Sequence, residues 1–454
     1  MRPFSPEHLI AALAPYPGAP RVWVAFSGGL DSTCLLSATA AAAGRLPGAL
    51  HAVHLDHGLH PDSARWAEHC LDVCEAMGVP LKIDQLSIRR APGESLEAVA
   101  REARYAALAA LLGPGDLVLT AQHQDDQAET LLLALLRGSG IEGLAAMGPV
   151  SRLGPGWLLR PLLDVPRAAL EAYAREEALP WIEDPSNASL AFDRNFLRRR
   201  ALPLLRRRWP SASATLARSA THCAEAADLI EAQAAEALAG LGGTRPGALS
   251  IAGVAGLDPA LARAAVRLWL RRRGLPLPDS AHLRRILTEV LPARSDVSPL
   301  VAWPGCEIRR FRGDLMALEP LPPPPTDLSL SWDGGVLVLP QPLGTLRRVP
   351  TGQGSEGVRG GDGAPRLRVR FGIPGQRCRT RPQGHRRALK KLFQEAAIPP
   401  WLRPYVPLVF AGDRLVAVAG VCACAGEPNA DHQGCGVRWE GHPWEGLGCF
   451  SAPG

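Results

Sequence analysis

Hydrophobic and polar positions form alternating blocks along the first third of the chain. Short apolar runs rich in β-branched residues predict buried strands, and the longer segments between them have helical spacing. The predicted strands are residues 22–26, 49–55, 79–86 and 116–121. The predicted helices are residues 32–43, 63–77, 95–112 and 126–136. This alternation predicts an α/β fold with a doubly wound parallel sheet, in which ligands bind beyond the carboxyl ends of the strands.

The pattern changes after this first domain, which we assign to residues 1–208. Residues 209–320 are rich in alanine and helical in spacing, and they predict an all-helical second domain. Residues 321–365 begin with a proline run and contain alternating stretches, so we expect a linker with possible strands. Residues 366–454 mix strand-like runs with one helical segment, which predicts a small α+β C-terminal domain.

The composition is that of an ordinary globular protein. Of the 454 residues, 46% are hydrophobic and 21% are charged. No apolar run reaches the roughly 18 residues that a membrane-spanning helix needs, and the N-terminus lacks the apolar segment of a secretory signal. We therefore expect a cytoplasmic protein with no membrane partner. The ten cysteines form no CxxC pair of the kind that holds zinc or an iron–sulfur cluster.

The sequence SGGLDS, residues 27–32, lies between the first predicted strand and the first predicted helix. A glycine turn at a helix N-terminus directs backbone N–H groups and the positive end of the helix dipole to one point, which suits a phosphate. This is not a Walker A loop, because no lysine follows the glycines. Asp31 would repel a phosphate, so we expect it either to hold Mg²⁺ there or to cap the helix.

A second polar group follows the predicted strand 116–121 and contains His123, Asp125, Asp126 and Glu129. Asp126 and Glu129 are three residues apart and share one helical face. Two carboxylates in this position could bind Mg²⁺, hold an ammonium group or accept a proton from an amine nucleophile. The alternative for Asp125 is only to stabilise the helix dipole.

His54, Asp56 and His57 follow the second predicted strand. Their spacing fits a metal site, but the position equally suits contacts to a nucleotide base.

Several arginines have two interpretations each. Arg104 follows helical spacing from Glu97 and Arg101, so it serves either ion pairs or phosphate contacts. Arg137 begins a basic turn, RGSG, close to the acidic group. A cluster of seven arginines suits a polyanion or forms a solvated helix face. Its members are Arg194, Arg198, Arg199, Arg200, Arg206, Arg207 and Arg208.

SGGLDS resembles the PP-loop of the ATP pyrophosphatase superfamily, whose members split ATP between the α and β phosphates to adenylate an oxygen. Five further blocks, in order, resemble the tRNA(Ile)-lysidine synthetase family over residues 20–205: VHLDHGL, EAVAREARYAAL, AQHQDDQAETLLLALLRGSGIEGLAAM, LLRPLLDVPR and EDPSNASLAFDRNFLRRRALPLL. Residues 384–421 resemble the C-terminal domain of that family. The glycine-rich residues 351–365 and the Cys/His-containing tail gain no role from the resemblance.

The resemblance implies a ligase that uses ATP to join L-lysine to C2 of the wobble cytidine in an isoleucine tRNA with a CAU anticodon. The reaction would pass through an adenylated cytidine and release AMP and pyrophosphate. The residues implied to bind ATP are Ser27, Gly28, Gly29, Leu30, Asp31 and Ser32, with His54 at the base or ribose.

Roles for the polar groups follow from the same resemblance. Asp31 would position Mg²⁺, while Asp126 and Glu129 would hold lysine and His123 would assist proton transfer. The residues implied to contact tRNA or the adenylated intermediate are Arg104, Arg137, Arg194 and Arg198. The second and C-terminal domains would grip the tRNA body through arginine–phosphate contacts. The oligomeric state and the division of roles among Asp125, Asp126 and Glu129 stay open.

Two classes of alternative are weighed against this interpretation. Another PP-loop enzyme is one: a tRNA cytidine 2-thiolation enzyme is expected to carry a CxxC pair, and GMP or asparagine synthetase is expected to bring a glutaminase domain, of which the chain has no sign. The other is a non-catalytic RNA-binding module with an inactive nucleotide fold. Release of pyrophosphate in the presence of tRNA, ATP and lysine separates the two classes.

Overall fold

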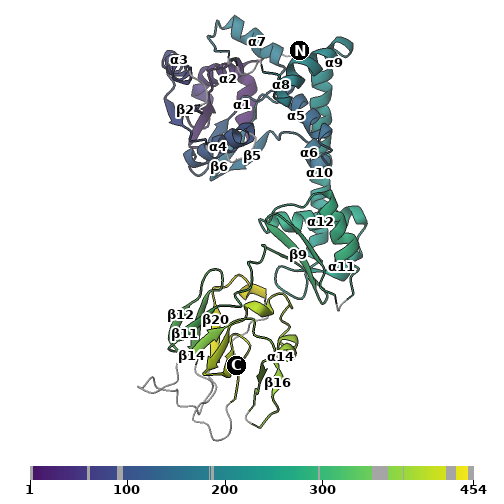
Figure 1. The fold of residues 1–454 in the computed structure, drawn as a ribbon. Coiled ribbons are helices and arrows are strands. Elements are labelled where there is room, and N and C mark those ends of the chain that lie inside the picture. Colours follow the sequence, from purple (N-terminus) through teal and green to yellow (C-terminus); the bar gives the residue numbers. More distant parts are fainter. Residues whose placement is uncertain are drawn as a thin grey trace. The chain divides into compact units, whose positions relative to one another are not determined.

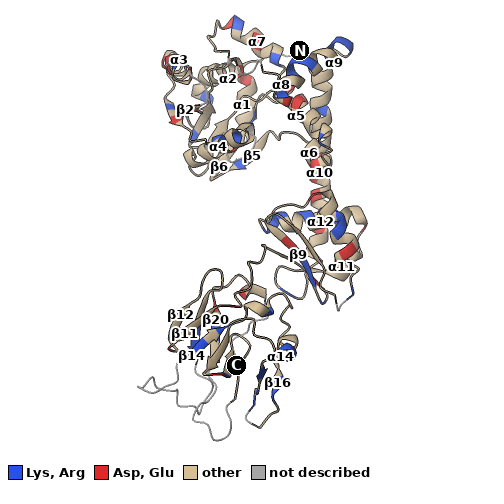
Figure 2. Ribbon diagram, viewed as in Figure 1, with Lys and Arg blue, Asp and Glu red and all other residues tan. Residues whose placement is uncertain are grey.

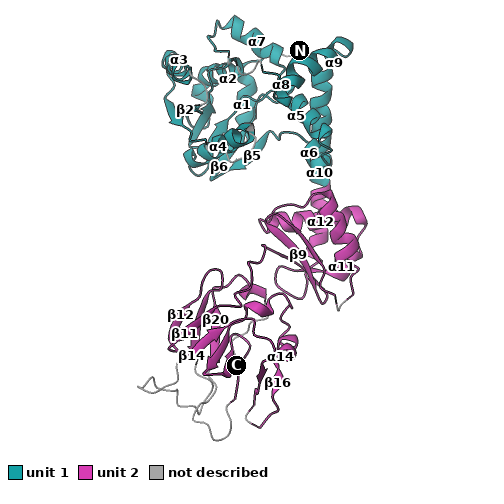
Figure 3. Cartoon of the chain, in the orientation of Figure 1, with its two compact units in different colours: residues 1–229 teal, residues 230–454 magenta. Residues whose placement is uncertain are grey.

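The computed structural model describes residues 4–58, 62–88, 96–183, 185, 189–294, 297–349, 367–381, 383–425 and 436–447. The chain forms two compact units, residues 1–229 and residues 230–454 (Figure 1, Figure 3). The boundary lies within the long helix α10 (Ala212–Ala239). No helix among the described residues is both long and apolar enough to cross a membrane.

A six-stranded sheet with the order β3-β2-β1-β4-β6-β5 forms the centre of the first unit. Its strands are β1 (Arg21–Ala25), β2 (Ala49–Asp56), β3 (Leu81–Gln85), β4 (Leu117–Leu119), β5 (Val150–Leu153) and β6 (Gly156–Leu159). All neighbours pair in parallel except β5, which is antiparallel to β6. The predicted parallel α/β domain is thereby confirmed.

The strand order makes the edge beyond β1 and β4 a binding position. The chain runs from β1 outward to β3 and then returns to β4 on the other side of β1. Connections therefore leave β1 and β4 in opposite directions, which opens a crevice at the carboxyl ends of these two strands. Both segments that carry the candidate chemistry follow these strands, at residues 27–32 and 120–129.

Helices cover both faces of this sheet (Figure 1). The α-helices described in this unit before α10 are α1 (Pro6–Leu13), α2 (Leu30–Ala41), α3 (Ser63–Ala76), α4 (Leu96–Leu111), α5 (Gln124–Leu136), α6 (Ile141–Leu144), α7 (Arg167–Glu176), α8 (Asp193–Phe196) and α9 (Leu202–Arg208). Val22 and Val24 of β1 pack in one apolar cluster with α1, α2 and α7, whereas Trp23 packs on the opposite face with Leu108 of α4. This alternation is that of a strand buried on both sides, and each fully buried Val or Leu contributes about 1.5–3 kcal/mol.

The second unit begins with a mixed region that corrects one expectation. Helices α11 (Ile251–Ala255), α12 (Pro259–Arg272) and α13 (Ser280–Arg285) lie where helices were predicted. However, the region predicted to be all-helical also contains a four-stranded antiparallel sheet, β7-β10-β9-β8. Its strands are β7 (Leu249–Ser250), β8 (Leu300–Trp303), β9 (Cys306–Phe311) and β10 (Asp314–Leu318).

The sheet gives the helices of this region an apolar partner. Val301, Ile308 and Leu315 from the strands pack with Val266 and Leu270 of α12 in one buried cluster. β8 alternates exposed and buried positions, as expected for a strand with one face on a core. An amphipathic helix must bury its apolar stripe, and here a sheet covers it.

Strands before residue 350 belong to the same core as the C-terminal residues. β11 (Ser329–Trp332) pairs with β14 (Leu367–Arg370), and β13 (Thr345–Val349) pairs with β20 (Gly436–Glu440). The remaining elements are β12 (Val336–Val338), β15 (Arg377–Cys378), β16 (Arg387–Ala388), α14 (Leu389–Glu395), β17 (Leu408–Ala411), β18 (Arg414–Val418) and β19 (Cys422–Ala423). The possible strands of the predicted linker 321–365 therefore exist and are paired, while residues 351–365 lie outside the described part.

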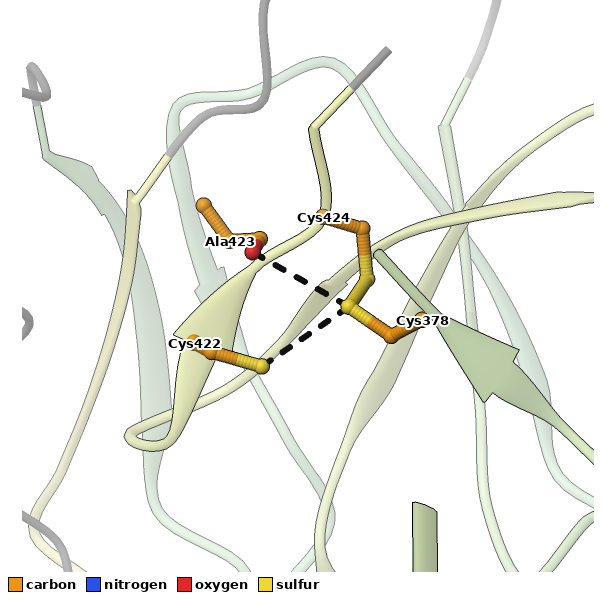
Figure 4. Close-up of a disulfide and its surroundings, with 4 residues drawn as sticks. All are labelled: Cys378, Cys422, Ala423 and Cys424. Carbon is orange, nitrogen blue, oxygen red and sulfur yellow. Dashed lines mark hydrogen bonds between the residues drawn. A yellow bond between two sulfur atoms is a disulfide. The ribbon is translucent and has the colours of Figure 1, made fainter. Parts of the chain in front are cut away.

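The cysteines that are close in sequence have two different environments. Cys70 and Cys74 are buried on α3, within the apolar cluster of the first unit. In the second unit a disulfide joins Cys378 of β15 to Cys424, and the Cys422 sulfur lies 3.8 Å from that of Cys378 (Figure 4). This bridge ties the β15–β16 pair to the segment after β19, the edge strand of the five-stranded sheet β11-β14-β17-β18-β19.

Candidate active site

The loop between β1 and α2 has the geometry of an anion-binding turn. Gly28 has φ +77°, and a Cβ at this position would lie 3.1 Å from the Cys70 sulfur. A side chain here would therefore be both strained and crowded. Gly29 is the N-cap of α2, and no side chain caps this helix end. The backbone N–H groups of the first turn, which begins at Leu30, are thus directed to a ligand position.

Hydroxyl groups fix the shape of this loop. The Ser27 N–H donates to Ser32 Oγ (3.2 Å), and the two serine hydroxyls are hydrogen-bonded (3.0 Å). Ser32 Oγ also donates to the Gly29 carbonyl (3.0 Å). On the other side, the Ile182 N–H donates to the Gly28 carbonyl (2.9 Å). The turn is therefore held from within and from a neighbouring loop.

Asp31 lies in the first turn of α2 and faces two basic groups. His123 Nε2 is 3.5 Å from Asp31 Oδ2, and Arg167 Nε is 3.9 Å from Oδ1. Oδ1 is buried and has no hydrogen-bond partner. Burial alone would raise the pKa of Asp31, but the hydrogen bond and charge of His123, together with the arginines, lower it. Asp31 is therefore an ionised carboxylate with one oxygen left over, which fits a divalent cation.

His123 is the N-cap of α5 and connects the two motifs. The His123 Nδ1 accepts a hydrogen bond from the Asp125 backbone N–H (3.2 Å), and the His123 backbone N–H donates to Asp126 Oδ2 (3.0 Å), which completes a capping box. Nε2 faces Asp31 and Asp126. Burial lowers the pKa of His123, but the hydrogen bond to Asp31 and the neighbouring carboxylates raise it overall. The ring can therefore hold or pass a proton at Nε2 between the two carboxylates.

Asp126 and Glu129 share one arginine. Arg198 donates to Glu129 Oε1 from Nε (2.7 Å), and from Nη2 it donates to Glu129 Oε2 (2.9 Å) and Asp126 Oδ1 (2.7 Å). Arg194 Nε lies 3.2 Å from Glu129 Oε2, and its Nη2 donates to Thr130. In Figure 2, blue and red stretches of ribbon lie close together where α8 and α5 are labelled. In this structure the two carboxylates of the acidic pair, Asp126 and Glu129, are therefore paired with arginine side chains of the same chain.

Burial and charge oppose each other in this pair. Glu129 is 0% exposed, and this burial raises its pKa although Arg198 and Arg194 lower it. The two carboxylates raise the pKa of Arg198 despite its burial, so this arginine stays charged. Two carboxylates matched by two guanidinium groups leave the cluster close to neutral.

A pocket of about 890 Å³ in the first unit opens beside these groups. His123, Glu129 and Arg198 line one part of it, and Arg167 and Glu171 of α7 line another. Its wall therefore carries both acidic and basic side chains, which suits a ligand that itself carries both charges.

The remaining candidate residues occupy different surroundings. His54 is buried, and its Nδ1 donates to the Phe26 carbonyl (2.9 Å), so it supports the loop from behind. Arg104 is exposed on α4, where its charge lowers the pKa of His57. Arg137 is the C-cap of α5 and lies 3.9 Å from the exposed Asp193.

The metal-site alternative for His54, Asp56 and His57 does not form. Across the described residues, no group of three or more His, Cys, Asp or Glu side chains is arranged to hold a metal ion.

Two arginines near the site received no individual role from the sequence. Arg167 lies by Asp31, and Arg206 binds Asp125 Oδ1 (2.6 Å) and the Ser213 hydroxyl. Arg167 lies in the LLRPLLDVPR block, which carries the family resemblance, and Arg206 lies in the arginine cluster. What the sequence lacked was a signal for which carboxylate each one faces.

Three family models match the chain. One described as a PP-loop domain matches residues 6–205, one described as the TilS substrate binding domain matches residues 249–316, and one described as the TilS substrate C-terminal domain matches residues 367–439. The first match contains the loop at residues 27–32 and the acidic pair, and the other two lie in the second unit.

Curated relatives cover nearly the whole chain. A tRNA(Ile)-lysidine synthase from Alkalilimnicola ehrlichii is 45% identical over 422 residues, which cover 92% of this chain and 93% of that protein. Proteins with the same name from Coxiella burnetii and Salmonella typhimurium are 38% and 42% identical. They cover 93% and 92% of this chain, and 94% and 96% of their own lengths is matched. The chain therefore belongs to the tRNA(Ile)-lysidine synthase family.

Proposed function

We propose that this protein uses ATP to attach L-lysine to C2 of the wobble cytidine in an isoleucine tRNA with a CAU anticodon. It is a ligase that forms a carbon–nitrogen bond, as its family membership implies. One observation carries the proposal: the anion-binding turn at residues 27–32 and the acidic pair on α5 meet through the contact between Asp31 and His123. An activated nucleotide and an amine can therefore be held at one place.

ATP would bind with its phosphates at the N-terminus of α2. The N–H groups from Leu30 onward and the Ser27 and Ser32 hydroxyls would face the phosphates. The buried Oδ1 of Asp31 accepts no hydrogen bond and fits Mg²⁺, which when bound supplies positive charge to the departing pyrophosphate. His54 holds the Phe26 carbonyl just before the loop, and its contact with the base or ribose stays a prediction.

The reaction needs two displacements at one site. First, the cytidine O2 attacks the α phosphorus, the bond to pyrophosphate breaks and the oxygen becomes a good leaving group. Second, the lysine ε-nitrogen attacks C2, the C2–O bond breaks and AMP leaves. The amine loses a proton in this step, and the Asp126 carboxylate would accept it, while the Nε2–H of His123 lies between Asp31 and Asp126 and would assist the transfer.

Lysine would bind at Asp126 and Glu129 in exchange for an arginine. Arg198 now occupies both carboxylates, so an incoming ammonium group must take over one of its contacts. This exchange leaves the charge of the buried cluster unchanged, whereas adding a cation without removing one would not. A released Arg198 would then be free to contact RNA phosphate or the adenylated base, and Arg194 could do the same.

The tRNA body would be bound largely through phosphate contacts, which give position and not sequence. Arg104 and Arg137 are exposed on the first unit, and we propose that the second unit adds further arginine contacts. Action on tRNA would place the protein in the cytoplasm.

Incubation with labelled lysine, ATP and a CAU-anticodon transcript, followed by nucleoside analysis, tests the proposal. We expect labelled lysidine at the wobble position, with AMP and pyrophosphate released in equal amounts. A transcript with uridine at the wobble position is the control and should remain unlabelled. Binding of tRNA without pyrophosphate release would favour a non-catalytic module, and adenylation without lysine incorporation would favour another PP-loop enzyme.

A further inference from the structure

The segment from residue 192 to residue 208 has two faces with different chemistry. One face points into the first unit, where Arg194 and Arg198 bind the acidic pair and Leu197 is buried. On the other face, Phe192 is 40% exposed and Phe196 is 51% exposed. The exposed part of each ring gains nothing from burial in the free protein and would gain from contact with a partner.

The two phenylalanines form one surface. Phe192 is the N-cap of α8 and Phe196 is its last residue, and the Phe196 N–H donates to the Phe192 carbonyl (3.0 Å), so the two residues lie about one helical turn apart. A π-helical turn, Leu197–Ala201, follows directly, and Arg200 on it is exposed. Arg207 and Arg208 are exposed one helix later. We call Phe192 and Phe196 the aromatic pair.

Charge identifies the kind of partner. Aromatic rings flanked by arginines are the combination that binds single-stranded nucleic acid, because the rings stack on bases while the arginines contact phosphates. An apolar protein partner or a lipid would use the rings but would gain less from the guanidinium groups. The aromatic pair also shares its short helix with Arg194, which contacts Glu129 at the candidate active site. Arg194 is two residues from each phenylalanine, so a base that stacks on the pair would lie beside the segment that contacts Glu129.

We infer that the aromatic pair is a stacking platform for unpaired anticodon-loop bases next to the base that is modified. This inference rests on the proposed function. Stacking would fix the loop against α8, and until lysine binds the contacts of Arg194 and Arg198 on the same segment would fix α8 against Asp126 and Glu129. The pair is thus a positioning surface, and it takes no part in the bond changes themselves.

Fluorescence of an anticodon stem-loop tests this inference with the full chain. The RNA carries 2-aminopurine beside the wobble cytidine, and stacking on an aromatic ring quenches its emission. Wild-type protein should quench the probe without ATP or lysine. The double variant F192A/F196A should lose the quench and weaken the dissociation constant by about tenfold or more. The variant F192Y/F196Y should keep both, because tyrosine also stacks.

Two controls separate this effect from unfolding and from a general loss of apolar surface. The F192A/F196A variant should bind ATP as wild type does, since the loop at residues 27–32 is untouched. Leu71→Ala removes a side chain of similar exposure, 42%, from α3 and should leave RNA binding unchanged.

The outcomes also separate this inference from the proposed function. Quenching that survives in F192A/F196A overturns the platform, whether or not lysidine is made. A chain that quenches through the aromatic pair but makes no lysidine would overturn the proposed function alone. If F192A/F196A loses binding to anionic phospholipid vesicles while its RNA affinity is unchanged, the surface serves a membrane and the inference is wrong.

Discussion

Each unit of the molecule contains a buried carboxylate bound by arginine, yet the two carboxylates have different surroundings. Asp314 in the second unit is 1% exposed and accepts from Thr244 N–H (2.7 Å), the Thr244 hydroxyl (2.6 Å) and Arg245 (2.8 Å). Arg245 donates in turn to the Ala397 carbonyl. Every partner of Asp314 is thus tied to backbone or to its neighbours, so this ion pair is structural.

Glu129 in the first unit is equally buried, but its partners can be replaced. Arg198 divides its bonds between Glu129 and Asp126, and both Arg198 and Glu129 line the open pocket. A ligand cation can therefore reach Glu129 through the pocket, whereas the side chains of Asp314 and Arg245 are only 1% and 9% exposed. Burial and charge pairing alone do not identify a binding site. A binding site also needs a path for the ligand and a partner that the ligand can replace.

The largest expected effect is that of replacing Asp31, which lies in the proposed ATP site of the first unit. Asp31→Ala should reduce ATP-dependent tRNA modification by at least about a hundredfold, because it removes the carboxylate proposed to hold Mg²⁺. Pyrophosphate release measures this loss. Asp72→Ala removes an exposed carboxylate from α3 and should be silent. Activity within a few-fold of wild type in Asp31→Ala would contradict the metal role.

Asp314→Asn should separate stability from catalysis. Loss of one charge from this buried pair leaves Arg245 without its partner and should lower the free energy of unfolding by about 3–5 kcal/mol. Denaturant melts report that change. The fraction of this variant that remains folded should have the wild-type KM for lysine. A raised KM would show that the Asp314–Arg245 pair is not purely structural.

Glu129→Gln and Asp126→Asn, unlike Asp314→Asn, should change the use of lysine. Each removes a charge-assisted contact worth about 1.5–3 kcal/mol, which corresponds to a rise in lysine KM of roughly ten- to hundredfold. Adenylation of tRNA, measured without lysine, should persist in part. Wild-type modification rate and lysine KM in both variants would refute the assignment of lysine to this pair.

The smallest expected effect concerns the rim of the same pocket, where His8 Nε2 lies 3.2 Å from Asp164. The hydrogen bond to Asp164 raises the pKa of His8, and the hydrogen bond to His8 lowers the pKa of Asp164. The stabilisation from His8 is present below its unfolded pKa of about 6.5 and is lost as pH rises through the raised value. The Asp164 part is present above its unfolded pKa of about 3.9 and is lost as pH falls through the lowered value.

The pair should therefore contribute most between about pH 4 and 6.5. Its contribution should stay below about 1 kcal/mol, because Asp164 is largely exposed and solvent screens it. Asp164→Asn should flatten this part of the stability profile. An unchanged difference between pH 5.5 and pH 8.5 in that variant would contradict the assignment.

The predictable parts of the molecule are those with local signals. The strand, glycine turn and helix around SGGLDS, and the helix that begins at His123, could be placed because propensity, turn residues and capping residues agree within a few positions. The antiparallel β5–β6 hairpin was missed. Its strands have only four residues each, with Arg152 and Gly156 among them, which is too short for a clear alternation.

Contacts over long separations could not be predicted. Arg198 and Glu129 are 69 residues apart in sequence, and nothing in either segment indicates that they pair. The same is true of Arg206 with Asp125. For the second unit, the alanine-rich helices dominated the pattern of residues 209–320, while β8, β9 and β10 show their role only when their apolar residues meet α12. Tertiary packing, and not local preference, determines these elements.

The two-step use of one site is tested most directly by following the α phosphate of ATP in the absence of lysine. With α-labelled ATP and the CAU-anticodon tRNA, label should become attached to the RNA, and later addition of lysine should release it as AMP while lysidine forms in equal amount. Lysine incorporation without any labelled RNA intermediate, or label on the RNA that lysine cannot displace, would contradict a shared site built from Asp31, His123 and the acidic pair.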